Sequence, residues 1–147
     1  MVGTWTTITA GAVYGPNSRQ RQSTGTGNNI YTWVLPVSTA GSYKVYAWWR
    51  KQTAQPQNVP YTTYHDTGSA TVTVNQKLTG DKWTLLGTYG LTPGQNDRVT
   101  VTDAATANLF VMADAVALAA SNATSWKAVW TPTLPYQTWS EWICGLL

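Results

Sequence analysis

The sequence predicts an all-β protein: one antiparallel β-sandwich of jelly-roll type, followed by a Trp-rich C-terminal extension. Apolar and polar residues alternate with period two along most of the chain, which is the pattern of half-buried strands. Turn residues interrupt this alternation about every eight to twelve residues, as in sandwiches and jelly rolls. The length of 147 residues fits one domain with an adequate core.

The expected strands follow one another through turns that contain Gly, Pro, Asn or Asp. They cover residues 29–37, 43–50, 58–66, 69–76, 82–91, 97–103 and 108–120. The last of these is ambiguous, because its alanines suit a helix. Val111, Val116 and the position after a run of strands favour a buried strand, which we prefer.

Composition limits the classes of function. Charged residues make up 10% of the chain, against about 25% in an average domain, so the surface is polar without being ionic. Such surfaces are typical of extracellular and virion β-proteins. The nine Lys and Arg residues are scattered, which argues against nucleic acid as a partner. No stretch reaches the ~20 apolar residues of a membrane helix, so we expect no membrane contact.

No secretory signal is visible after Met1, where the chain continues directly as VGTWTTITAG. Two interpretations fit an extracellular type of surface on such a chain. The chain could be a domain taken from a larger secreted protein. Alternatively, it could leave the cell without secretion, as phage structural proteins do at lysis.

The stretch YKVYAWWRK, residues 43–51, places aromatic side chains on both faces of one expected strand. Its odd-numbered residues form a core face, whereas Tyr46 and Trp48 point the other way. An outward aromatic pair can stack on the pyranose rings of a polysaccharide or anchor a protein partner. It could also be covered by the tail of the same chain or belong to a second-sheet core, because exposed aromatic patches seldom stay uncovered.

A second candidate edge precedes the turn at residues 67–68. Tyr61, Tyr64 and His65 could contact a sugar there. In the alternative interpretation, His65 packs on Tyr64 and Asp66 accepts backbone N–H groups of the turn. The candidate residues for glycan or partner binding are therefore Tyr46, Trp48, Tyr61, Tyr64 and His65.

The segment 121–147 differs in composition from the rest of the chain. Pro132 and Pro135 forbid a long helix, and the segment is too rich in tryptophan to be left in water. We expect it to dock on the domain's own sheet or, preferably, on a neighbouring subunit. Cys144 either packs as a small apolar residue or forms an intermolecular disulfide. The candidate assembly residues are Trp126, Trp130, Trp139 and Trp142.

Catalysis and metal binding have little support in this sequence. The chain has one histidine, His65, and six scattered acids, so paired acid–base groups are missing and we do not expect an enzyme. A single cysteine excludes a cysteine cluster for zinc. Asp114 lies within an apolar strand, where a carboxylate must be caged by backbone donors or bind calcium, and we prefer the cage. We therefore predict no metal site and no cofactor.

Most of the chain resembles the golvesin C-terminal-like domain, also called the xanthan-lyase carbohydrate-binding-like domain. The resemblance implies a β-sandwich appended to secreted enzymes and surface proteins, with a role in binding polysaccharide. The resemblance implies no particular binding residue. The chain departs from the family pattern in two places: Trp48 stands where family members often have a charged residue, and the tail from Ser121 is extra. The stretches that carry the resemblance are GTWTT (3–7), YGPNSRQ (14–20), TWVLPVSTAGSYKVYAWW (32–49), VPYTTYHDTGSATVTVNQ (59–76), KWTLLGTYGLTPG (82–94), VTVTDAA (99–105) and VMADAVAL (111–118).

We expect a sandwich domain over residues 1–120 and an extension for assembly or docking over 121–147. Two classes of function compete for this architecture. The first is a non-catalytic structural or adhesion subunit of a virion or extracellular filament, such as a phage decoration or fibre protein. It would assemble with copies of itself or another structural protein and possess an optional glycan site. The alternative is a carbohydrate-binding module of a secreted polysaccharide-active protein. Either class places the chain outside the cell or on a virion surface.

Overall fold

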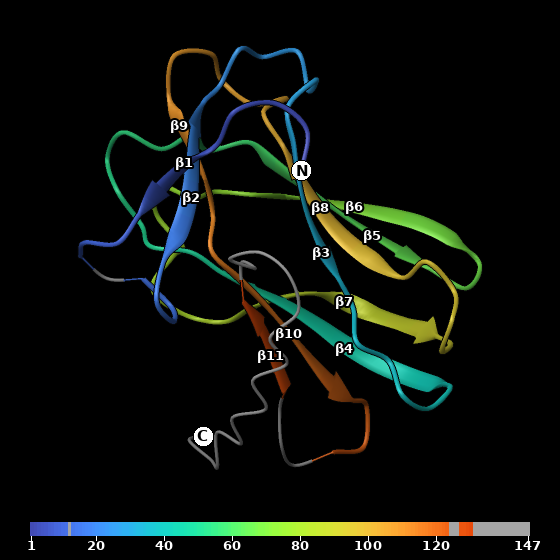
Figure 1. Ribbon diagram of the computed structural model, residues 1–147. Coiled ribbons are helices and arrows are strands. Elements are labelled where there is room, and N and C mark those ends of the chain that lie inside the picture. The colour runs from blue at the N-terminus through green and yellow to red at the C-terminus, as the bar shows by residue number, and fades with distance from the viewer. Residues whose placement is uncertain (12, 124–126, 131–147) are drawn as a thin grey trace.

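Strands are the only regular elements in the part of the chain that the computed structural model describes, namely residues 1–11, 13–123 and 127–130 (Figure 1). The all-β prediction is therefore confirmed. Within those ranges no helix is long and apolar enough to cross a membrane. The strands are β1 (Thr6–Ile8), β2 (Ser18–Gln22), β3 (Ile30–Val34), β4 (Gly41–Trp48), β5 (Val59–His65), β6 (Gly68–Val74), β7 (Thr84–Leu91), β8 (Arg98–Thr102), β9 (Phe110–Ala113), β10 (Ala115–Ala120) and β11 (Lys127–Trp130).

The strands form three antiparallel sheets. The β3 sheet has the order β3-β8-β5-β6, and the β4 sheet has the order β11-β10-β4-β7. These two sheets make the sandwich that the alternating pattern predicts. A small sheet, β1-β2-β9, lies beside them at the upper left of Figure 1. β1 and β2 overlap the stretches 3–7 and 14–20, where periodicity had predicted no strand.

The core lies between the β3 and β4 sheets and is rich in aromatic rings. Val45, Ala47 and Trp49 are fully buried, which confirms the odd-numbered face of residues 43–51 as a core face. The Trp33 ring stacks on Tyr61 at 6.1 Å between centroids, and the Trp49 ring lies 5.8 Å from the same tyrosine. Each large side chain buried in this way stabilises the fold by about 2 kcal/mol.

The segment 108–120 is extended, as preferred from the sequence, but it is broken into two strands at Asp114. β9 pairs with β2 of the small sheet, and β10 pairs with β4 of the sandwich. The buried Gln76 side chain holds the end of β9, since its amide donates to the Met112 carbonyl at 2.7 Å and accepts from the Met112 N–H at 2.9 Å. The break at Asp114 thus passes the chain from one sheet to the next.

Four residues of the C-terminal extension belong to the β4 sheet. β11 pairs antiparallel with β10, and the register places Trp130 beside Ala115 and Ala128 beside Ala117. The backbone of the extension therefore continues the sheet beyond residue 120, although a functional division there stays a prediction. Trp126, Trp139, Trp142 and Cys144 lie outside the described residues.

Candidate functional site

Three aromatic side chains, which we call the aromatic cluster, gather at one end of the β4 sheet: Tyr14, Trp48 and Trp83. Trp48 ends β4, and Trp83 immediately precedes β7, the strand that pairs with β4. Tyr14 enters from the segment between β1 and β2. Its ring lies 4.8 Å from the Trp83 ring and 5.8 Å from the Trp48 ring, and all three residues are half-buried.

Small residues on β10 lie beside the outward aromatic residues of β4. Trp48 pairs with Ala115, and Tyr46 pairs with Ala117, so these side chains share one face of the sheet. On the other side Tyr46 pairs with Leu85, which is 49% exposed. The face opposite the core therefore carries an apolar and aromatic strip that includes both predicted residues, Tyr46 and Trp48.

Asp114 anchors the backbone of the cluster's third member. The Tyr14 N–H donates to both carboxylate oxygens of Asp114, at 3.1 and 3.2 Å. Burial raises the pKa of Asp114 to about 7, and this effect outweighs the opposing hydrogen bond from Tyr14. The preferred interpretation of Asp114 was a backbone cage, and the structure supplies one backbone donor. In the described ranges, no three His, Cys, Asp or Glu residues are grouped to hold a metal ion.

The raised pKa of Asp114 predicts a specific pH dependence of stability. Between pH ~4 and ~7 the folded protein retains a proton on Asp114 that the unfolded chain has lost, so stability falls as pH rises through this window. We expect Asp114→Asn to remove this loss, which should exceed about 1 kcal/mol in total. Urea unfolding from pH 4 to 8 measures it. Parallel profiles for the wild type and the variant would contradict the assignment.

Tyr61, a predicted sugar contact, is instead a core residue, and that prediction is wrong. It is 1% exposed, and its hydroxyl donates to the Met112 carbonyl and accepts from the Gln76 amide, both at 3.2 Å. Burial raises its pKa and keeps the hydroxyl neutral. The reason is the alternation of β5, which turns Val59, Tyr61 and Thr63 towards the core.

Tyr64 lies on the outer face of the β3 sheet, on the other side of the sandwich from Tyr46 and Trp48, whereas His65 continues the inward-facing set of β5 at the end of that strand. The Arg98 guanidinium lies 3.7 Å from the centre of the Tyr64 ring and covers one of its faces. His65 stacks on Tyr89 at 4.8 Å rather than on Tyr64, because neighbours in a strand point to opposite faces. Asp66 accepts from the Thr92 hydroxyl rather than from the turn.

The five predicted residues therefore do not form one site. Tyr89, the partner of His65, pairs with Tyr43 near the start of β4, whereas Trp48 ends that strand. Tyr46 and Trp48 stay together on one face, and the structure adds Tyr14 and Trp83 to Trp48. Sequence reasoning missed both. Trp83 could have been found from its place directly before the strand that pairs with β4.

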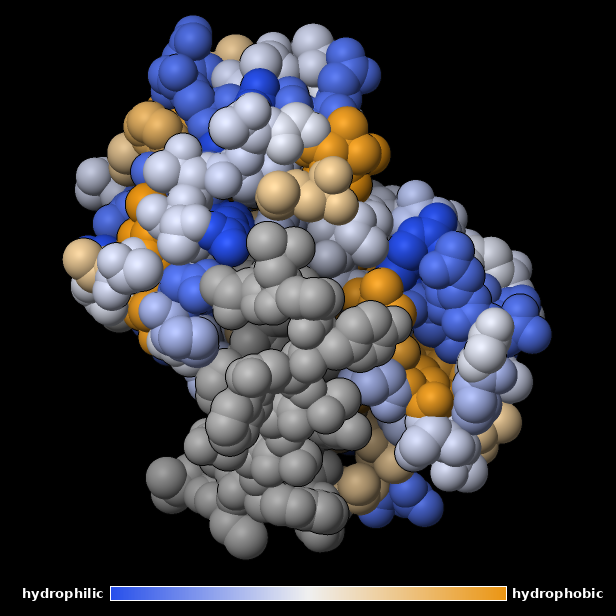
Figure 2. All heavy atoms as spheres, in the orientation of Figure 1, coloured by the Kyte–Doolittle hydropathy of each residue, from blue (hydrophilic) through white to orange (hydrophobic). Residues whose placement is uncertain are grey.

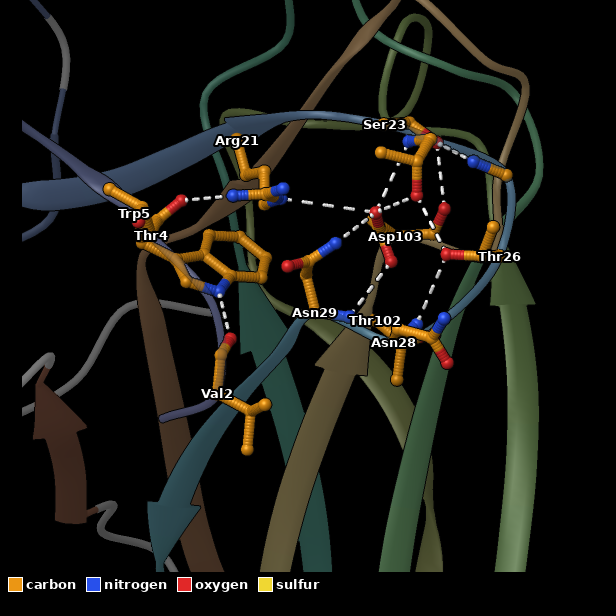
Figure 3. A network of polar contacts seen from close by, with 12 residues as sticks. Val2, Thr4, Trp5, Arg21, Ser23, Thr26, Asn28, Asn29, Thr102 and Asp103 are labelled. Atoms are coloured by element: carbon orange, nitrogen blue, oxygen red, sulfur yellow. Dashed lines mark hydrogen bonds and ion pairs between the residues drawn. The ribbon is translucent and has the colours of Figure 1, made fainter.

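A buried carboxylate that sequence reasoning also missed organises the loop after β2 (Figure 3). Asp103 is fully buried and accepts from the backbone N–H and hydroxyl of Thr24, and from the backbone N–H and side-chain amide of Asn29. Burial alone would raise the pKa of Asp103, but these hydrogen bonds outweigh it and lower the pKa to about 2. The sequence signal is the segment STGTGNN, residues 23–29, where Gly25 and Gly27 adopt positive φ around the carboxylate.

The comparisons with known proteins agree with one another. The family model described as "Golvesin C-terminal domain" matches residues 1–120. Xanthan lyase of Bacillus sp. (strain GL1) is 32% identical over 117 residues, which cover 78% of this chain and 13% of that protein. The solved structure of Paenibacillus xanthan lyase matches with a TM-score of 0.74 and 37% identity, over 81% of this chain and 11% of that one. The chain thus corresponds to a small part of each of these larger proteins.

Proposed function

This chain belongs to the Golvesin C-terminal domain family, and we propose that it is a non-catalytic polysaccharide-binding module of an extracellular, polysaccharide-active protein. Both xanthan lyases are far longer than the chain, so this chain corresponds to a module and not to the whole enzyme. These relatives favour the carbohydrate-binding alternative over a subunit of a virion. The observation that carries the proposal is the half-buried aromatic cluster of Tyr14, Trp48 and Trp83.

The cluster has the chemistry that sugar binding needs. Aromatic rings offer wide apolar faces on which the C–H faces of pyranose rings can pack, while the polar edges of Tyr and Trp accept and donate hydrogen bonds. The Tyr14 ring is inclined by 48° to Trp48 and by 70° to Trp83. Such rings form an angled surface rather than a plane. We therefore propose a single, twisted polysaccharide chain as the ligand, in preference to a flat crystalline polymer.

The C-terminal extension stays outside this proposal. The family match ends at residue 120, and neither comparison supports a role in assembly. Docking through Trp126, Trp130, Trp139 and Trp142 remains a prediction. Association with further copies of the chain also remains a prediction.

Polysaccharide binding tests the proposal. We expect the chain to be retarded in native gels that contain xanthan or another soluble polysaccharide, with a Kd of roughly 10 µM to 1 mM, because a shallow site gains only a few kcal/mol. Trp48→Ala and Trp83→Ala should each weaken binding at least tenfold, which corresponds to about 1.4 kcal/mol.

Leu85→Ala is the matched control, because it removes an exposed apolar side chain from the same face. Its mobility should stay close to that of the wild type. All variants are first checked for an unchanged melting temperature. Retardation that survives both tryptophan substitutions would contradict the proposed site, and its absence with every polysaccharide would contradict the function.

A further inference from the structure

A shallow hollow of about 500 Å³ lies where the end of β2 meets the start of β9 and the segment that leads into β1. This volume is in the range of small-molecule sites, ~300–1,000 Å³. No member of the aromatic cluster lines it, so the hollow is a separate feature. Its lining includes Thr4, Thr6, Arg21, Gln22, Asn108 and Phe110.

Arg21 is held in place on one side and available on the other. Its Nη1 donates to the Thr4 carbonyl at 2.7 Å, and its Nε lies 3.9 Å from the Asp103 carboxylate (Figure 3). Within the described part of the chain, its Nη2 makes no hydrogen bond. A guanidinium fixed in this way loses little side-chain entropy when it donates to a ligand.

Other polar groups of the hollow are also available. The Gln22 amide nitrogen donates to the Asn108 carbonyl at 3.3 Å, which leaves its oxygen as an acceptor. The hydroxyls of Thr4 and Thr6 and the side-chain amide of Asn108 make no hydrogen bonds with other described residues. Several donors and acceptors that line the hollow therefore have no partner among the described residues, and the hydroxyls of a sugar could bind to them.

Phe110 adds an apolar face to this polar set. The residue is 36% exposed and pairs in register with Gln22, so its ring and the amide are neighbours on one face of the small sheet. A pyranose unit has an apolar C–H face and a polar hydroxyl edge. The Phe110 ring can pack against the C–H face, and the neighbouring Gln22 amide can hydrogen-bond to the hydroxyl edge. On the side of the molecule shown in Figure 2, the coloured residues include apolar ones as separate patches among polar ones.

The walls of the hollow are fixed by backbone hydrogen bonds. The Ser23 N–H donates to the Leu109 carbonyl at 2.7 Å, and the Asn108 N–H donates to the Ser23 carbonyl at 2.9 Å. Asn108 has φ +66°, a left-handed conformation that is uncommon outside glycine. The surrounding structure holds it there, and such conformations cluster at ligand sites.

The charge balance of the hollow indicates the class of ligand. Among the described residues that line the hollow, Arg21 is the one ionisable residue, and the ionised Asp103 lies against it. The charge of the guanidinium is therefore largely balanced from within the protein, which weakens its attraction for an anion. We infer that the hollow is a second sugar site, which binds an uncharged glycosyl unit. The inference rests on the proposed polysaccharide-binding function.

An NMR titration of the full chain tests this second site. The probes are hexasaccharides of glucose, mannose and galactose, with hexagalacturonate as the anionic comparison. We expect at least one neutral probe to shift the backbone amides of Gln22, Asn108 and Phe110. Hexagalacturonate should bind there at least tenfold more weakly. Phe110→Ala and Gln22→Ala should each weaken binding of the neutral probe at least tenfold. Leu78→Ala, which removes a 64% exposed apolar side chain elsewhere, should not.

The outcomes separate the second site from the aromatic cluster. Shifts confined to the indole signals of Trp48 and Trp83 would overturn the second site and leave the proposed function intact. Shifts at the hollow without any at the indoles would support the second site and overturn the placement of the first. Preference for hexagalacturonate at the hollow would overturn the uncharged ligand. If none of the probes shifts the backbone amide signals of Gln22, Asn108 and Phe110, the second site would be overturned.

Discussion

Asp103→Ala is expected to lower the free energy of unfolding by about 3–5 kcal/mol, because partly buried backbone N–H groups lose a charged acceptor that is itself fully buried. Thr24 and Asn29 each donate a backbone N–H to this carboxylate, at 3.1 Å in both cases, and Arg21 loses its counter-charge. Urea unfolding at pH 7 measures the loss. Asp103→Asn keeps the shape of the side chain and should cost roughly half as much.

The same carboxylate predicts how stability responds to acid. The folded pKa of about 2 lies below the unfolded value, so the stabilisation is complete above pH ~4 and disappears as pH falls from ~4 to ~2. A shift of this size corresponds to about 2 kcal/mol. Asp103→Asn should flatten this acid limb of the profile. A wild-type profile that is flat below pH 4, or an Asp103→Ala variant as stable as the wild type, would contradict the role of the network.

Tyr61→Ala is expected to cost about 3–5 kcal/mol, as for other large-to-small substitutions in a core. The ring lies against Trp33 and Trp49 and is 1% exposed, so its removal leaves a cavity between the sheets. The change should appear as a lower denaturation midpoint. We do not expect Tyr61→Ala to weaken sugar binding selectively, that is, without loss of stability.

Two substitutions show whether the ring or the hydroxyl of Tyr61 matters. Tyr61→Phe keeps the ring and removes a hydroxyl, and the Gln76 amide still has the Met112 carbonyl, so we expect a cost of about 1 kcal/mol. Tyr64→Ala, in the same strand but half-buried under Arg98, should stay within about 1 kcal/mol of the wild type. An unchanged midpoint for Tyr61→Ala would place the ring outside the core.

Period-two alternation was sufficient to predict the class of the fold and most of the sandwich strands. It identifies Val45, Ala47 and Trp49 as inward, and it separates the outward Tyr46 and Trp48 from them. The same alternation could have excluded a joint site of Tyr61 and Tyr64, because residues three apart in a strand face opposite sides. That error came from grouping by proximity in the sequence.

The remaining parts of the site depend on contacts between distant segments, which local patterns do not encode. Tyr14 reaches Asp114 across 100 positions, and Thr24 reaches Asp103 across 79. β1 has only three residues, TTI, and β2 carries two Arg and two Gln, so neither strand has an apolar face that would mark it as a strand. The hollow beside them follows from the pairing of β2 with β9, and single-sequence periodicity does not predict that pairing.

The central claim is that the aromatic cluster binds polysaccharide, and the indole N–H signals of the chain test it most directly. In a titration with soluble xanthan fragments, we predict saturable shifts for Trp48 and Trp83. The buried Trp33 and Trp49 serve as internal controls and should stay in place. Binding of the fragments without any movement of the Trp48 and Trp83 signals would contradict the account.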